Sequence, residues 1–304
     1  PWSRITMIQA SHFDPNTAYA SVDRHQLQDF EPYIYRTRDK GSTWQRITTG
    51  MPRGVYVHVV KEDPKRQGFL VAGTERAIHV SFDNGDNWQP FNLNMPVTSM
   101  RDFEFYQNDL IVATHGRGFW ILDDISPLRQ INGTTQLEDG FLFTPASVVN
   151  IAETTDNGTP LQKDEPQAEN PPSGAIIYYY LKQPAKAPVK LDIVDSTGAV
   201  VQTFSSEPTA AAPGNSPGSG QTSRNALPRV SPLWQRSPFV LPATAGLHRV
   251  VWNAVRPRPR GADPADEGGP LDRLYIGNFA ARLTVNGKTQ TQPFVLNPDP
   301  RIKS

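Results

Sequence analysis

The residues best suited to chemistry lie between positions 101 and 124, where charged side chains alternate with short apolar runs. The run His115-Gly116-Arg117-Gly118 joins two apolar segments, so we expect a turn whose glycines allow positive φ. A guanidinium on such a turn could bind a carboxylate through two parallel hydrogen bonds. The structural alternative, which we favour, is that Arg117 pairs with Asp123 or Asp124, or that these residues cap the domain junction. The candidate binding residues are Arg101, Asp102, His115, Arg117, Asp123, Asp124 and, much later in the chain, Trp234.

No complete catalytic set can be assembled from the sequence. The six histidines are scattered, no Ser-His-Asp triad is suggested by spacing, and no Gly-x-Ser-x-Gly elbow occurs. Histidine pairs at zinc-ligand spacing are missing and the chain has no cysteine, so we expect neither a metal site nor a cofactor. Inverting glycoside hydrolysis needs two carboxylates about 6.5–9.5 Å apart, and no such pair can be named. The sequence therefore predicts no catalytic residue.

Two octets of the form Ser/Thr-x-Asp-x-Gly-x-x-Trp organise the first half of the chain, and they lie 44 residues apart. In each octet the Asp carboxylate can accept hydrogen bonds from backbone N–H groups of its own turn, and the Gly can adopt positive φ. The Trp is expected to anchor the turn on the sheet, so its replacement by Ala should cost about 3–5 kcal/mol. We interpret all these positions as structural: Thr37, Asp39, Gly41, Trp44, Ser81, Asp83, Gly85 and Trp88.

The sequence around the octets repeats as well. An Asp-Pro turn and a small apolar segment precede each octet, and a Met-Pro pair follows it. A third unit starts at Val97 and has two apolar runs but no octet. A period of about 40–50 residues indicates a propeller or a solenoid, and each unit reads as a four-stranded blade. Residues 1–126 therefore predict two to three blades, fewer than the roughly four that a closed ring needs.

With these octets the chain resembles the Asp-box (BNR-repeat) proteins, which include sialidases, xyloglucanases and the sortilin (Vps10) propellers. The likeness to bacterial sortilin-like proteins, often named glycosyl hydrolase-like, also rests on residues 72–76, 113–124, 169–177, 246–252 and 283–301. It covers nearly the whole chain, as the C-terminal portion of such a protein. The resemblance implies a bacterial extracytoplasmic location, periplasmic or secreted, and places the octets at the periphery of the blades.

The composition changes after the third unit. Residues 127–174 are rich in polar residues, Gly and Pro, and are predicted to form a linker that wraps the propeller. Residues 175–304 contain several short strand patterns and no helical pattern, which is typical of an immunoglobulin-like or fibronectin-like β-sandwich. Within them, Asn286-Gly287 is a two-residue hairpin signal and residues 205–232 are predicted to form a long mobile loop. The fold class expected for the whole chain is all-β.

The bulk properties narrow the function. Thirty basic and thirty acidic residues cancel, so the net charge favours neither nucleic acid nor an anionic membrane. The sequence has no apolar run of transmembrane length and no signal peptide, and the chain looks like a piece of a longer precursor. We expect the remaining blades to come from an upstream segment or from a second chain.

Two functions remain open. The favoured one is a non-catalytic interaction or scaffold module that binds a protein or glycan partner as part of a larger propeller. The other is the C-terminal part of a glycoside hydrolase of the sialidase or xyloglucanase type, whose active site lies mostly in other blades. The Asp-box marks a fold and does not by itself establish an activity.

Overall fold

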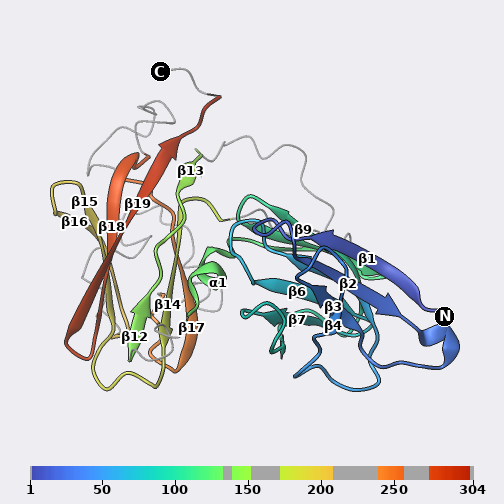
Figure 1. The fold of residues 1–304 in the computed structure, drawn as a ribbon. Helices are drawn as coiled ribbons and strands as arrows, with labels where there is room; N and C mark the ends of the chain where they lie inside the picture. Colours follow the sequence, from blue (N-terminus) through green and yellow to red (C-terminus); the bar gives the residue numbers. More distant parts are fainter. Residues whose placement is uncertain (1, 133–138, 152–171, 208–238, 257–273, 302–304) are drawn as a thin grey trace, which may run out of the picture. The chain divides into compact units, whose positions relative to one another are not determined.

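Almost all of the regular secondary structure in the described residues is β-strand (Figure 1). The structure is a computed structural model that describes residues 2–132, 139–151, 172–207, 239–256 and 274–301. Within these residues the helices are one short α-helix, α1 (Ser126–Gln130), and one 3-10 turn, η1 (His25–Leu27). The chain divides into two compact units, residues 1–133 and 134–304. The predicted all-β class is confirmed.

Unit 1 begins with two four-stranded antiparallel sheets in which consecutive strands are neighbours. The first sheet contains β1 (Arg4–Ala10), β2 (Ala18–Asp23), β3 (Ile34–Thr37) and β4 (Gln45–Arg46). The second sheet contains β5 (Val57–Glu62), β6 (Leu70–Thr74), β7 (Ile78–Ser81) and β8 (Gln89–Pro90). In both sheets an octet forms the turn between the third and fourth strands. The repeat in the sequence is therefore a repeat of whole sheets.

The third sheet of unit 1 has three strands, β9 (Ser99–Tyr106), β10 (Asp109–His115) and β11 (Phe119–Leu122). It leads into α1, where we had expected the linker to begin. The linker boundary stays a prediction, and α1 itself is tied to the second sheet. Leu128 of α1 is buried, and the guanidinium of Arg129 pairs with the fully buried carboxylate of Asp63 at 2.9 Å.

Two hydrophobic clusters join the three sheets of unit 1. One lies between the first and second sheets and the other between the second and third. Strand β5 contacts β1 and β2, and β9 contacts β5 and β6, so the first strands of successive sheets are neighbours. Burying one large apolar side chain contributes about 1.5–3 kcal/mol. Stacking of sheet on sheet therefore contributes to the stability of this unit.

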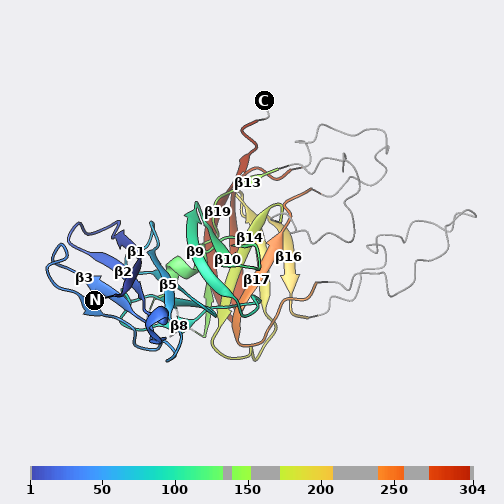
Figure 2. The same ribbon diagram turned by 90° about the vertical axis from the view of Figure 1, so that its right-hand side faces the viewer.

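Unit 2 contains two further sheets (Figure 2). Their inward side chains form a single hydrophobic cluster, which includes Tyr179, Trp252 and Leu283. The three-stranded sheet contains β12 (Gly140–Leu142), β14 (Ala175–Leu181) and β17 (Gly246–Trp252). The five-stranded sheet contains β13 (Val148–Asn150), β19 (Lys288–Pro298), β18 (Gly277–Val285), β15 (Lys190–Asp195) and β16 (Val200–Ser205).

Strands β12 and β13 lie in the segment that we had predicted to be a linker. They differ from that expectation because each is held by a partner far away in the sequence. The backbone N–H of Leu142 donates to the side-chain oxygen of Gln290 at 2.8 Å, and the Gln290 amide donates to the carbonyl of Gly140 at 2.8 Å. Strand β13 pairs in parallel with β19.

The predicted hairpins of unit 2 are present. Strands β15 and β16 flank the turn after Asp195, and β18 and β19 flank Asn286-Gly287, whose φ angles are 48° and 80°. Positive φ at both positions matches the two-residue turn that an Asn-Gly pair favours. Most of the predicted mobile loop, from residue 208 onwards, and Trp234 lie outside the described residues.

Candidate interaction surface

The first octet forms a turn that satisfies its own polar groups. The hydroxyl of Thr37 donates to the Asp39 carboxylate at 2.8 Å and accepts from the Gly41 N–H at 2.9 Å. The backbone N–H of Thr43 donates to the same carboxylate at 2.8 Å. Hydrogen bonds from the Thr43 hydroxyl and N–H and from Thr37 lower the pKa of Asp39 to about 2. This carboxylate is a fixed acceptor in a turn, which does not suit a catalytic acid.

The second octet has the same hydrogen bonds. The Ser81 hydroxyl donates to Asp83 at 2.7 Å and accepts from the Gly85 N–H at 2.9 Å, and the Asn87 N–H donates to Asp83 at 2.9 Å. Burial alone would raise the pKa of Asp83, but hydrogen bonds from Asn87 and Ser81 outweigh it and hold the pKa below its ordinary value. The two octets are equivalent in their local chemistry.

The two octets differ in what their tryptophans contact. Trp88 is only 4% exposed, and its indole N–H donates to the carbonyl of Ile47 at 2.8 Å, while its backbone N–H donates to Thr49 at 2.9 Å. Both acceptors follow the last strand of the first sheet. Trp44 is 40% exposed, and no described residue accepts a hydrogen bond from its indole. Trp44 therefore lacks the contacts that bury Trp88, and its role as an anchor stays a prediction.

The same contrast holds along the first strands. Val57 and Val60 of β5 are completely buried against the first sheet. The corresponding residues of β1 are Ile5 and Ile8, since Ile5 and Val57 pair with Val22 and Thr74, and Ile8 and Val60 pair with Ala20 and Ala72. Ile5 is 59% exposed and Ile8 is 58% exposed. We call the surface formed by Ile5, Ile8 and Trp44 the open face of the first sheet.

The third sheet exposes apolar side chains on its other side. Phe119 and Ile121 of β11 are 79% and 61% exposed. They correspond to Ile78 and Val80 of β7, which are buried against the third sheet, because both pairs follow a turn closed by a threonine hydroxyl. We call the surface formed by Phe119 and Ile121 the open face of the third sheet. The first and third sheets thus each expose apolar side chains whose counterparts in the second sheet are buried.

A row of polar residues crosses the first strands of all three sheets. The register of β1, β5 and β9 shows a bulge in each, and the extra residue is Thr6, His58 or Arg101. Bulges redirect a side chain and are often found next to functional sites. The sequence signal for this row is a polar residue that interrupts the apolar pattern of each first strand, and we had identified only Arg101.

His58 is the buried member of this row. Burial and the positive charge of Arg101 lower its pKa to about 4, so its imidazole is neutral near pH 7. The ring of nearby His25 stacks on the ring of Tyr56, with 4.6 Å between the ring centroids. The Nδ1 atom of His25 is also hydrogen-bonded to the buried Asp23 carboxylate at 2.7 Å. Within the described residues no group of three or more His, Asp and Glu could hold a metal ion.

The other predicted binding residues do not converge on one site. Asp102 pairs with Lys61 of β5 at 3.1 Å, and no pattern in the sequence indicates this partner. His115, the last residue of β10, and Arg117, in the turn between β10 and β11, are both exposed. The predicted pairing of Arg117 with the following aspartates stays a prediction.

The two aspartates after β11 have a structural place. Asp124 is buried, and its carboxylate accepts a hydrogen bond from the backbone N–H of Ser126 at 3.1 Å, at the start of α1. Its own N–H donates to the Asp109 carboxylate at 2.9 Å. Asp123 is half-buried beside it. These contacts fit the capping alternative for this segment.

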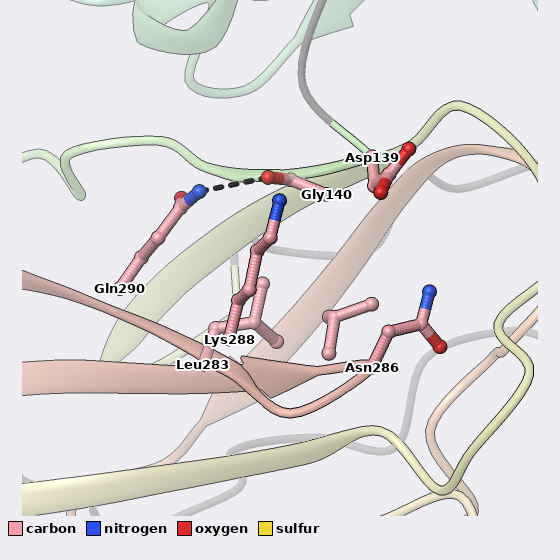
Figure 3. A pocket seen from close by; sticks show the side chains of 7 residues that line it. Asp139, Gly140, Leu283, Asn286, Lys288 and Gln290 are labelled. Atoms are coloured by element: carbon pink, nitrogen blue, oxygen red, sulfur yellow. Dashed lines mark hydrogen bonds between the residues drawn. The ribbon is translucent and has the colours of Figure 1, made fainter.

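Unit 2 contains a small cavity (Figure 3). It lies between the start of β12 and the β18–β19 hairpin, next to the hydrogen bond from Gln290 to Gly140. Its volume is about 50 Å³, enough for one or two water molecules. Leu283 and Val285 line its apolar side, and Lys288 lies at its polar side.

In the part of the chain that the structure describes, no helix is long and apolar enough to cross a membrane.

Comparison with known proteins gives little further guidance. No protein-family model and no curated protein matches the chain. Among solved structures, it is similar to YCF48 bound to a D1 peptide, with 15% identity over 66% of this chain and 54% of that chain and a TM-score of 0.28. It is also similar to an ancestral GH74 enzyme, with 12% identity over 66% of this chain and 27% of that chain and a TM-score of 0.28. The chain spans about half of the first protein and about a quarter of the second, and TM-scores this low assign neither a fold nor an activity.

Proposed function

We propose that this chain is a non-catalytic interaction module that binds a protein partner within a larger β-propeller assembly. The observation that carries the proposal is the open face of the first sheet, where Ile5, Ile8 and Trp44 are exposed although their counterparts in the second sheet are buried. Contiguous exposed apolar side chains mark interaction sites. In this proposal the three sheets of unit 1 are blades, and unit 2 is an immunoglobulin-like or fibronectin-like sandwich.

The alternative, part of a glycoside hydrolase, lacks a supporting observation. The carboxylates of Asp39 and Asp83 are held by their octets, Asp23 is bonded to His25, and Asp102 pairs with Lys61. A hydrolase needs one free acid and one free base or nucleophile facing a common cleft. The extracytoplasmic location is proposed on the sequence resemblance alone, and a glycan partner remains the second choice to a protein.

The proposal can be tested on the full chain by sedimentation velocity over a concentration series. A module separated from its partner should self-associate through its open faces, and Ile8→Lys or Ile121→Lys should weaken this association. The matched control is Val200→Lys, because Val200 is 47% exposed but lies in unit 2. Equal association of all four proteins would contradict the proposal. Hydrolysis of aryl glycosides that depends on a carboxylate of this chain would favour the enzyme instead.

A further inference from the structure

The open face of the first sheet repeats one side of a contact that the chain already makes. The second sheet presents Val57, Val60 and Trp88 to the first sheet, and all three are buried there. The first sheet presents Ile5 and Ile8, together with Trp44, in the same arrangement to solvent. We propose that this face receives a further four-stranded antiparallel sheet of the same repeat type, and that Trp44 donates its indole N–H to a backbone carbonyl of that sheet. This inference rests on the proposed function and names the partner.

The existing contact defines where the new carbonyl must lie. Trp88 bonds the carbonyl of Ile47, and the Ile47 N–H in turn donates to Ile34 at 2.8 Å, just after the fourth strand. The second sheet ends in the same way, since the Phe91 N–H donates to Ile78 at 2.8 Å. The acceptor is therefore a backbone group that every four-stranded repeat offers at the end of its fourth strand.

The contact also requires a glycine in the incoming sheet. Gly50 has φ of +89°, and a Cβ atom there would lie 2.3 Å from the carbonyl oxygen of Trp88. Any other residue at this position would collide with the backbone of the neighbouring octet. The partner sheet should accordingly carry a glycine three residues after the residue that corresponds to Ile47.

The charged residues at the existing contact restrict which sheet can bind to this face. At the existing contact the buried Arg36 donates to the carbonyl of Asn84 at 2.7 Å and pairs with Asp86 at 3.0 Å. In the first octet, Lys40 and Ser42 stand at the positions of Asn84 and Asp86. An arginine in the incoming sheet would thus keep its backbone acceptor but lose the carboxylate, and a lysine would replace Asn84. The partner should be acidic or neutral at the position that corresponds to Arg36, so an unaltered copy of the first sheet is disfavoured.

The test supplies such a sheet within the same polypeptide. The full chain is extended at Arg4 by a second copy of residues 4–55, which includes the natural connection between the first and second sheets. In the added copy, Arg36→Glu provides the complementary charge, and Trp44→Phe leaves the original Trp44 as a single reporter. Hydrogen exchange of the indole N–H groups is then followed by NMR in the extended and unextended chains.

We expect the exchange of the original Trp44 indole N–H to slow at least about fivefold in the extended chain, as a new hydrogen bond of ordinary strength would cause. Ile8→Lys in the original first sheet should abolish this slowing of exchange. An added copy that keeps Arg36 should slow the exchange of the Trp44 indole N–H less than the Arg36→Glu copy does. Unchanged exchange at Trp44 with normal protection of Trp88 would overturn the inference. Loss of Trp88 protection in the extended chain would also overturn it, because the face would then be unable to receive a sheet without disruption.

The outcome is independent of the association experiment. Sedimentation shows whether the module binds another molecule through either open face, whereas the extended chain shows only what fits on the first sheet. Protected Trp44 without any self-association would support the inference and contradict the proposed function. Self-association through Ile121 with no slowing of exchange at Trp44 would support the proposed function and contradict the inference.

Discussion

The indole N–H of Trp88 donates a 2.8 Å hydrogen bond to the backbone carbonyl of Ile47, which lies 41 positions earlier in the chain. This bond joins the octet of one sheet to the end of the sheet before it. Because Trp44 has no such acceptor among the described residues, two side chains in equivalent turns should differ in their contribution to stability.

The first prediction compares these two tryptophans. Trp88→Ala should lower the free energy of unfolding by about 3–5 kcal/mol, because it leaves a large cavity between two sheets. Trp44→Ala should lower it by only about 1–2 kcal/mol, because the side chain is already partly in water. Urea denaturation of both variants checks this order. Equal losses would show that Trp44 is as well packed as Trp88.

The second prediction concerns the octet glycines. Both have φ of +89°, but a Cβ on Gly85 would lie 2.4 Å from Cδ1 of Ile47, whereas one on Gly41 would meet nothing closer than 3.8 Å. Gly41→Ala should therefore cost about 1–2 kcal/mol from backbone strain alone, and Gly85→Ala should cost more. Adding Ile47→Val removes the clashing methyl group and should restore part of the difference. Thermal unfolding of Gly41→Ala, Gly85→Ala and the double variant Gly85→Ala/Ile47→Val measures the loss of stability in each.

The third prediction concerns the ion pair that fixes α1. Arg129→Ala leaves the carboxylate of Asp63 without its guanidinium partner in a fully buried place, so we expect a loss of about 3–5 kcal/mol. Two backbone N–H groups, of Lys65 and Arg66, still donate to this carboxylate and should keep the loss from being larger. Arg117→Ala is the matched control, with an expected change within about 0.5 kcal/mol. A neutral Arg129→Ala would mean that α1 is not held by this pair.

The fourth prediction is a pH dependence caused by His58. Its pKa falls from an ordinary 6.5 to about 4 because burial and Arg101 disfavour the imidazolium; Asp23 opposes this, and His25 and Arg4 add to it. The unfolded chain therefore binds a proton more readily than the folded chain between these two pH values. Stability should decrease as the pH falls from about 6.5 to about 4, by up to roughly 3 kcal/mol.

His58→Gln should flatten this part of the stability profile, measured by urea denaturation at several pH values. His115→Gln serves as the control, because His115 is exposed and its replacement should leave the profile unchanged. A profile that is the same in the wild-type and the His58→Gln protein would contradict the prediction.

Features that depend on neighbouring residues were predictable from the sequence. The octet turns and the Asn286-Gly287 hairpin have side chains and φ angles that a few adjacent residues dictate. Strand β14, expected at 175–181, matches the structure for the same reason, since its pattern is continuous. Such elements carry their information locally.

The features that were missed depend on distant partners. The exposure of Trp44 depends on which sheet lies beside it, and its octet is no different from that of Trp88. The bulge at His58 is a property of the register between β5 and β6, which residue types alone do not determine. Strand β12 has only three residues and is completed by Gln290, 148 positions from Leu142.

The amide of Gln290 has a consequence for the border of its sheet. It occupies the N–H of Leu142 and the carbonyl of Gly140, two of the outward groups that an extended peptide would use to add itself to β12. A side chain thus imitates one peptide unit of a missing strand. The Gln290 side chain therefore hinders the addition of a further strand at this edge of unit 2. The exposed apolar faces of unit 1 have no such cover and can bind a partner.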